Sequence, residues 1–452
     1  MQVLLQNRMK MAALGSRMRF TTPIGKNLRP RITSVNVVPA SLHTGAGGTQ
    51  IALLPVARSV GWWLVGMSGL VAGMVAVGGI TRLTKSGLSM TDWKLQGSMP
   101  PMNLEEWNKE FDRYKQFPEW QQRKSMTLDE FKYIFYWEWG HRMMGRSLGI
   151  AFAVPFAIFA ARGMIPRRLM PRMALLFGLG GTQGLIGWWM VKSGLDKQTI
   201  IGLDQGREIR VSPYRLATHL GMAFTTFGAC LWTALEILKP TGDTVSSVLK
   251  EVRSVQPQVL RAAQRLRGHA VLNLVLVGTT VMSGAYVAGN DAGRAYNTFP
   301  KMGDEWIPEG ILELQPVWRN FFENTATVQF DHRCLALTAL ASITGMFVFA
   351  RRGAGGQLWA HVLPSHAKKW LHSAIGMGGV QVGLGITTLL MYAPINLAAT
   401  HQMGSLALLT FSTGVVHSLR FVGPLSARAA GLGVGAAPQA VAMAGAAAKT
   451  AM

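Results

Sequence analysis

The chain has 452 residues, of which 49% are apolar and only 15% are charged, yet its formal net charge is +23. An average soluble domain has about 25% charged residues, and the apolar content excludes a disordered chain. A soluble nucleic-acid-binding protein would be equally basic but would not have a positive mean hydropathy of +0.22. The two cysteines exclude a disulfide framework and a four-thiolate metal site. The remaining interpretation is a membrane protein that crosses the bilayer several times, with its positive charge outside the lipid.

The first 58 residues form a separate region by composition. They contain eight Arg or Lys residues and no Asp or Glu, and small and hydroxyl-bearing residues fill much of the remainder. This composition is typical of a cleaved organelle-targeting segment. The alternative is a disordered basic tail. In both cases we leave 1–58 out of the predicted fold.

Eight long apolar runs follow, and each is about as long as a helix that crosses a bilayer. They lie near 60–80, 137–161, 173–191, 213–236, 270–289, 326–350, 371–391 and 396–419. The sequence therefore predicts an all-α integral membrane protein with eight transmembrane helices. An even number of crossings places both ends of the mature chain on one side.

Basic residues are concentrated in three of the connections between these runs. The segments after the second, fourth and sixth runs carry four, six and four basic residues, against none, two and none that are acidic. The 82–130 loop has eight of each sign, and the 290–324 loop has three basic and six acidic residues. By the positive-inside rule, both termini and the basic loops face the matrix or cytoplasm. The excess charge is a topology signal, and we expect no nucleic-acid partner.

Matching motifs show that the chain repeats itself. They pair the second helix with the sixth, the third with the seventh, and the fourth with the eighth, at offsets of 191, 198 and 182 residues. The pairs are Glu138-Trp-Gly-His141-Arg142 with Gln329-Phe-Asp-His332-Arg333, Gln183-Gly-Leu-Ile-Gly187 with Gln381-Val-Gly-Leu-Gly385, and Ala217-Thr-His219 with Ala399-Thr-His401. Because each unit has four helices, both units have the same orientation in the membrane, as in a parallel repeat. We predict two tandem four-helix bundles.

Four of the ten histidines belong to this repeat: His141, His219, His332 and His401. Each is expected five or six residues inside its helix from the outer surface, or roughly 7–9 Å deep. Two imidazoles at one depth in each bundle fit the two axial positions of a haem iron. The alternatives are a hydrogen bond between helices for each single histidine, and zinc or copper for each pair. Two histidines without Cys or carboxylate ligands make a poor closed site for those metals.

The residues around these histidines support the haem interpretation. We expect Arg142, Arg146 and Arg333 to neutralise haem propionates near the outer surface. Small residues would let a flat macrocycle approach a helix, although each of them could equally serve helix packing. They are Gly140, Gly145, Gly184, Gly187, Gly221, Gly383 and Gly385. The histidines at 269, 361, 366, 372 and 417 lie at or beyond the basic side, so we expect them to be interfacial or solvated.

The two units differ at one informative position. Glu138 lies one helical turn before His141, and the corresponding residue of the second unit is Gln329. A carboxylate beside a haem edge can act as a general base, and a neutral amide cannot. The first bundle is therefore predicted to be catalytic and the second to transfer electrons. The alternative is that Glu138 only forms an ion pair with Arg142.

The longest motifs of the chain resemble those of the mitochondrial haem A synthase family of cytochrome oxidase assembly proteins. They include GGITRLTKSGLSMTDWKLQGSMPPMNLEEW, MTLDEFKYIFYWEWGHRMMGR, GLDQGREIRVSPYRLATHLG and AGNDAGRAYNTFPKMGDEWIP, followed by VQFDHR and ATHQ. The resemblance covers roughly 58–422. It implies oxidation of the C8 methyl group of haem O to a formyl group, which gives haem A, with water as the oxygen source.

The resemblance also assigns the residues. His141 and His219 would hold the iron of haem O or haem A, His332 and His401 would hold that of a resident haem b, and Glu138 would be the catalytic carboxylate. The implied setting is the mitochondrial inner membrane with both mature termini in the matrix. A haem O synthase would act upstream, a ferredoxin system is one candidate electron acceptor, and a homo-oligomer is left open.

The predicted organisation follows from these assignments. A targeting segment (1–58) precedes the substrate bundle (59–238), a matrix linker (239–269), the haem b bundle (270–422) and a disordered tail (423–452). Trp107 and Phe111 have helical spacing in the 82–130 loop, which predicts a short amphipathic cover over the outer face.

The rival function is a non-catalytic, bis-His diheme b-type electron carrier, which would not need an acid at 138.

Overall fold

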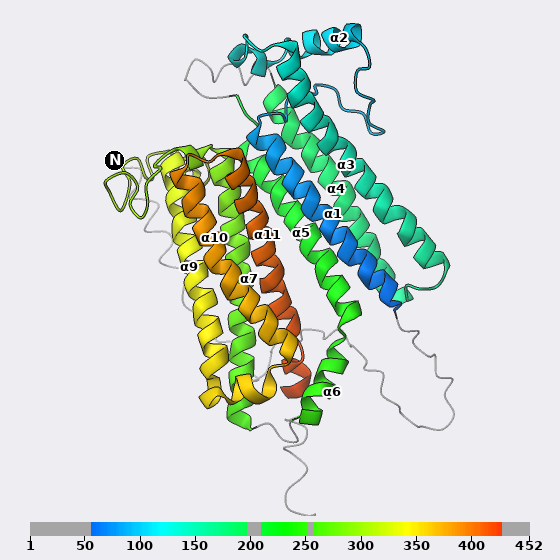
Figure 1. Ribbon diagram of the computed structural model, residues 1–452, viewed down its shortest axis with the longest axis vertical. Coiled ribbons are helices and arrows are strands. Elements are labelled where there is room, and N and C mark those ends of the chain that lie inside the picture. Colours follow the sequence, from blue (N-terminus) through cyan, green and yellow to red (C-terminus); the bar gives the residue numbers. More distant parts are fainter. Residues whose placement is uncertain (1–55, 197–208, 252–255, 427–452) are drawn as a thin grey trace, which may run out of the picture. The chain divides into compact units, whose positions relative to one another are not determined.

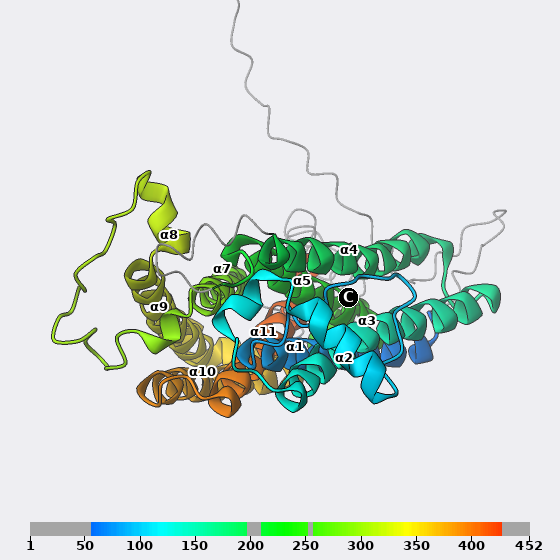
Figure 2. The same ribbon diagram turned by 90° about the horizontal axis from the view of Figure 1, so that it is seen from above.

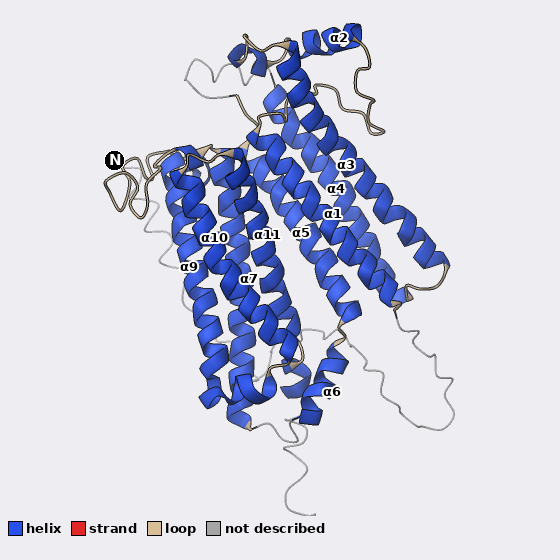
Figure 3. Ribbon diagram, viewed as in Figure 1, coloured by secondary structure: helices blue, strands red, loops and turns tan. Residues whose placement is uncertain are grey.

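The computed structural model describes residues 56–196, 209–251 and 256–426, which fold into helices and connecting loops (Figures 1 and 3). Within these ranges there is no β-strand, only a single bridge between Met302 and Glu305. Nearly all of the targeting segment and most of the predicted disordered tail lie outside the described residues.

Eight described helices are long and apolar enough to cross a membrane, which confirms the predicted number of spans. Those of the first half are α1 (Arg58–Leu83), α3 (Leu128–Ala161), α4 (Met170–Leu195) and α5 (Pro213–Leu238). Those of the second half are α7 (Pro257–Gly289), α9 (Thr325–Arg352), α10 (Ser365–Leu390) and α11 (Ile395–Ser418). Three shorter helices lie in the connections, namely α2 (Leu104–Tyr114), α6 (Thr241–Glu251) and α8 (Asn320–Glu323).

Two helices begin earlier than the apolar runs predicted. The second span was expected near 137 but α3 begins at Leu128, and the fifth was expected near 270 but α7 begins at Pro257. Thr127 starts α3 with a reciprocal capping box, in which its hydroxyl accepts from Glu130 N and the Glu130 carboxylate accepts from Thr127 N. Both extensions mix charged with apolar residues, so a search for unbroken apolar runs does not detect them. Part of the predicted linker is therefore helical, in α6 and the start of α7.

Helices of each half contact one another, and α1 and α5 of the first half also contact α7 and α11 of the second. Between the halves lies an apolar cluster to which α1, α5 and α11 all contribute, through Val75, Phe224 and Leu406 among others. Polar contacts also join the two halves, and among them Gln402 Nε2 donates to the Val75 carbonyl at 3.0 Å. The tandem-bundle organisation itself stays a prediction.

The connection between α1 and α3 packs onto the end of α3 (Figures 1 and 2). Trp107 and Phe111 of α2 are buried, with ring centres 5.1 Å from Phe135 and 4.9 Å from Phe131, respectively. Asn103 caps α2 by accepting from Glu106 N at 2.9 Å. The short amphipathic helix predicted in this loop is therefore present.

A buried carboxyl in this loop should make its packing sensitive to pH. Burial raises the pKa of Glu119 to about 7, although Arg123 opposes the rise. A raised pKa means that the folded loop holds its proton more tightly than the unfolded loop, so the contribution of Glu119 to stability falls as pH rises from about 4.5 to about 7. The protection of 104–127 against hydrogen exchange, corrected for the intrinsic rise of the exchange rate with pH, should therefore fall over this interval. In Glu119→Gln that loss of protection should disappear, and an unchanged profile in the variant would contradict the assignment.

Candidate functional site

Each of the four repeat histidines lies against a glycine on a neighbouring helix. His141 of α3 faces Gly78 of α1, where an added Cβ atom would lie 2.9 Å from the ring. The same arrangement recurs three times, with added Cβ atoms 2.9, 3.1 and 2.9 Å from the rings. These contacts are Gly187 with His219, Gly284 with His332, and Gly385 with His401. Any side chain at these glycines would displace an imidazole, so the fold reserves space for four rings.

The second-half pair has the geometry that one bound metal ion requires. The ring centres of His332 and His401 are 6.4 Å apart, and the rings are mutually perpendicular at 90°. Two imidazoles that coordinate one ion through bonds of about 2 Å have ring centres about 6 Å apart. The separation of His332 and His401 therefore fits axial ligation of a single iron.

In the first half, His141 and His219 are close enough to interact electrostatically. The Nδ1 atom of His219 is buried and has no hydrogen-bond partner among the described residues. Buried polar atoms normally have a partner, so an unpaired ring nitrogen marks an unexplained site. Gln183 Nε2 donates to the His219 carbonyl at 3.0 Å, as Gln381 Nε2 does to the His401 carbonyl at 2.9 Å.

The donor set suits a macrocycle better than a bare ion. Within the described ranges, no group of three or more His, Cys, Asp or Glu side chains is placed to hold a metal ion. Closed zinc sites use four protein ligands. A haem iron needs only two, because the porphyrin supplies the others. The residues present therefore fit haem in both halves.

Glu138 is buried, with 2% of its surface exposed, and both carboxylate oxygens are engaged. Oε1 accepts from Arg142 at 2.6 Å, which is the ion pair that the sequence left as the alternative role. Oε2 accepts from the Ser89 hydroxyl at 2.7 Å and from the Met90 amide at 2.8 Å. The carboxylate thus connects α3 to the loop that follows α1.

Gln329 makes the corresponding connection in the second half with reversed polarity. Its Nε2 donates to the carbonyl of Ala292 at 2.7 Å and to that of Ala295. Its Oε1 accepts from Arg333 at 3.1 Å. Glu138 and Gln329 therefore share a structural task, but only Glu138 offers a group that can accept a proton.

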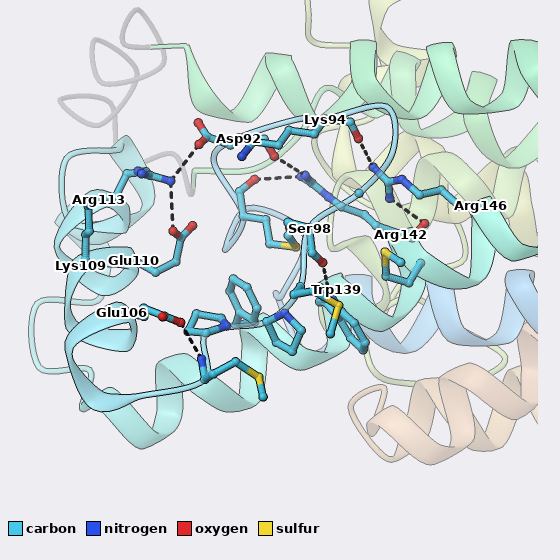
Figure 4. Close-up of a pocket in the computed structure, with 18 residues that line it drawn as sticks. Asp92, Lys94, Ser98, Glu106, Lys109, Glu110, Arg113, Trp139, Arg142 and Arg146 are labelled. Carbon is cyan, nitrogen blue, oxygen red and sulfur yellow. Dashed lines mark hydrogen bonds and ion pairs between the residues drawn. The ribbon is translucent and has the colours of Figure 1, made fainter.

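The three arginines that the sequence assigned to propionates donate to loop carbonyls, and their contact with propionates stays a prediction. Arg142 donates to Met90 O and Asp92 O, both at 2.8 Å, and Arg146 donates to Lys94 O (Figure 4). Arg146 also donates to Leu95 O at 2.9 Å. Arg333 donates to Tyr296 O at 2.7 Å and Lys301 O at 3.1 Å. The acceptors are backbone carbonyls of irregular loops, which no sequence pattern identifies. The role of these arginines in holding the loops could therefore not be predicted.

A cavity of about 470 Å³ lies between α2, the 90–102 loop and α3, and none of the four repeat histidines lines it (Figure 4). From α3 it is lined by Phe135, Trp139, Arg142, Met143 and Arg146. His141 faces α1 instead, so the cavity lies on another face of α3 and is not the haem site.

The other histidines fall into two groups. His269, His361 and His372 are exposed and His366 is half-buried, as an interfacial or solvated position requires. His417 is only 6% exposed, and its ring lies 5.3 Å from Trp232, so the prediction was wrong for this residue. It occupies a helix interface that its position near the chain's basic side did not reveal.

Two of the glycines that the sequence singled out touch histidines, namely Gly187 and Gly385. Gly140, Gly184 and Gly383 have no neighbouring atom within 4 Å of an added Cβ. Gly78 and Gly284 were not predicted from the sequence. Two similar segments could have revealed them, namely Val75-Ala-Val-Gly78 and Val281-Met-Ser-Gly284. This pair extends the repeat to the first helix of each half at an offset of 206.

The glycine contacts lead to a direct test. Gly385→Ala should displace the His401 ring, because the new Cβ would lie 2.9 Å from it. Overpacking of this kind costs roughly 1–3 kcal/mol, so we expect a lower melting temperature and loss of haem from the purified protein. Gly383→Ala on the same helix is the matched control and should keep both. Equal haem content in the two variants would contradict a reserved space for the ring.

The chain was compared with known proteins. It matches the family described as cytochrome oxidase assembly protein over residues 61–413. It is 48% identical to Heme A synthase COX15 of Arabidopsis thaliana over 366 residues, which are 81% of this chain and 75% of the relative. The human Heme A synthase COX15 is 44% identical over 88% of this chain and 92% of the relative.

The name of a third relative describes it as a fusion with a mitochondrial ferredoxin. The Heme A synthase-mitochondrial ferredoxin fusion protein of Schizosaccharomyces pombe is 39% identical over 80% of this chain and 60% of the relative. The family match covers well over half of the chain, and these relatives align along most of its length. This chain therefore belongs to the cytochrome oxidase assembly protein family.

Proposed function

We propose that this protein is a haem A synthase, which oxidises the C8 methyl group of haem O to a formyl group with water as the oxygen source. In balanced form, –CH3 and H2O give –CHO with release of four protons and four electrons. The observation that carries the proposal is Glu138, a buried carboxylate one turn before His141 where the second half has Gln329. The printed names of the relatives support the same function.

The residues divide between two haem sites. We assign haem O, and haem A after reaction, to His141 and His219, and a resident haem b to His332 and His401. When bound, haem b supplies reversible one-electron redox chemistry. The glycine contacts support these sites, because each imidazole is held at a fixed depth by a neighbouring helix.

Glu138 would accept a proton released during oxidation of the methyl group. Arg142 keeps the carboxylate at its position in α3 through the 2.6 Å ion pair. Ser89 and Met90 hold the other carboxylate oxygen and thereby close the loop over this end of α3. Arg146 and Arg333 fix the two outer loops through loop carbonyls, and Arg142, Arg146 and Arg333 would also neutralise haem propionates.

The wider setting is proposed from sequence features. We place the protein in the mitochondrial inner membrane, with the basic loops and both mature termini in the matrix, because eight spans and the loop charges support this topology. The fused mitochondrial ferredoxin of one relative supports a ferredoxin as electron acceptor. A haem O synthase would supply the substrate. Within this scheme the first half (59–238) holds the substrate site and the second half (270–422) holds haem b.

The second candidate is the diheme electron carrier without catalysis. It is favoured by one observation, namely that both oxygens of Glu138 are already engaged in structural contacts. Chromatography of haems extracted from the purified protein tests both functions. A haem A synthase should contain haem b together with haem O or haem A, and should convert supplied haem O to haem A. An electron carrier should contain haem b alone and form no haem A.

A further inference from the structure

The two proposed haem sites differ in how their histidines are held. One difference is the residue that precedes the glycine beside His141 and the glycine beside His332. Ser283 precedes Gly284 in α7, and at the offset of 206 the first half has Val77 before Gly78. The Ser283 hydroxyl oxygen lies 2.7 Å from Nδ1 of His332. The same hydroxyl donates its hydrogen to the Thr280 carbonyl at 2.8 Å.

This arrangement favours one tautomer of His332. A serine hydroxyl has one hydrogen to donate, and the Thr280 carbonyl lies where it can accept it. With its hydrogen directed at Thr280, Ser283 is placed to accept a hydrogen bond from His332 Nδ1–H, which would leave Nε2 with a free lone pair. A metal-ligating histidine requires this state, in which one nitrogen is anchored and the other is free to coordinate.

The first half lacks such an anchor. Nδ1 of His219 has no partner within the described part of the chain, no hydrogen bond from the His141 ring is found there, and Val77 could not provide one. In the second half, Gln381 Nε2 lies 3.2 Å from Nδ1 of His401, but an amide nitrogen only donates, so this contact does not supply the acceptor that Ser283 offers to His332. The contrast between the halves therefore rests on Ser283 and His332.

We propose that Ser283 makes the second-half haem a permanent resident, and that Val77 at the corresponding position leaves the first-half site free to exchange its haem. An anchored imidazole loses less freedom on coordination and is a better donor. The inference rests on the proposed function, in which haem enters one site as substrate and leaves it as product while the other haem stays. Ser283 is a positioning residue, because it acts through His332.

The test measures haem release instead of turnover. Purified protein is mixed with excess apomyoglobin, and the haem that stays bound is extracted and separated by chromatography, so that loss of haem b reports on the second half and loss of haem O or haem A reports on the first. Loss of an outer-shell partner weakens metal binding roughly 10–100-fold, so Ser283→Ala should accelerate release from the second half by a similar factor. Ser283→Thr keeps the hydroxyl and should restore slow release. The reciprocal Val77→Thr, which keeps the shape of valine, should slow release from the first half.

Thr279→Val is the matched control, because Thr279 lies one turn away on α7 and its hydroxyl bonds only to the Val275 carbonyl of its own helix. Its release rates should equal those of the wild type. Equal rates in Ser283→Ala and Thr279→Val would overturn the inference, as would failure of threonine to restore slow release. Haem A formation is measured separately on the wild type. An absence of haem A would refute the proposed function and leave the Ser283 result to be judged by release alone.

Discussion

Replacement of Glu138 by glutamine should abolish haem A formation while both haems stay bound. The variant gives the first half the residue that the second half already has at Gln329, where an amide connects the helix to the outer loop. Loss of a positioned general base typically lowers a rate roughly 10²–10⁴-fold. Haem content by absorbance and haem A by chromatography, measured on the same preparation, would show the two effects separately.

The structural contacts of Glu138 require a control that preserves the carboxylate. Ser89→Ala removes one hydrogen bond to Oε2 and leaves the charge, the Arg142 pair and the Met90 contact in place. If Glu138 acts chemically, this variant should keep most of its activity. Equal losses in Ser89→Ala and Glu138→Gln would show that the carboxylate serves only to hold the loop. The exchange variant Glu138→Gln with Gln329→Glu should stay inactive, because the acid would then lie beside the wrong haem.

Substitution of His332 by glycine should remove haem b from the second half and leave the first-half haem in place. His332 is one of two rings 6.4 Å apart, and no third His, Cys, Asp or Glu within the described ranges is placed to take over its role. Free imidazole should enter the space left beside Gly284 and restore the absorbance of the low-spin, six-coordinate haem. The measurement is the reduced-minus-oxidised spectrum with and without imidazole.

The control for this variant is His417→Gly. His417 is equally a buried histidine of a long helix, but it contacts Trp232 and has no counterpart in the repeat. Its removal should leave both haem spectra unchanged. If haem b survives in His332→Gly without imidazole, His332 is not an axial ligand, and the assignment of the second-half site would have to be abandoned.

The features that were predictable from sequence are those set by local composition. Runs of apolar residues identified all eight spans, because a helix in lipid must be apolar over its whole crossing. The same criterion misplaced the start of α3 by nine residues, since charged residues interrupt the apolar ones in the turns that begin at Leu128, and the Thr127 cap fixes this start. His141 was expected five or six residues inside its helix, counted from the start of the apolar run. Because α3 begins earlier than that run, His141 lies farther inside α3 than expected. Gly78, which lies against the His141 ring, is five residues from the end of α1.

The residues that sequence analysis could not assign are those whose partners lie on other elements. His141, His219, His332 and His401 were found because they repeat. The role of Arg146 was missed because its acceptors are backbone carbonyls of a loop with no regular pattern. Ser283 was missed because the sequence alone gives no role to a single serine in an apolar helix. The structure reveals its role by placing its hydroxyl 2.7 Å from the ring of His332.

The contact between Gln402 and Val75 has a consequence for the folding of the two halves. If the second half were produced alone, the Gln402 amide would lose its acceptor, and an unpaired amide in an apolar environment is costly. Asp291 would also lose Arg82 and Arg210, which lower its pKa against the effect of burial. Either half expressed separately should therefore be prone to degradation, and co-expression of both halves should rescue it. If the two halves arose by duplication, as the repeat predicts, such contacts would have joined them into a single folding unit.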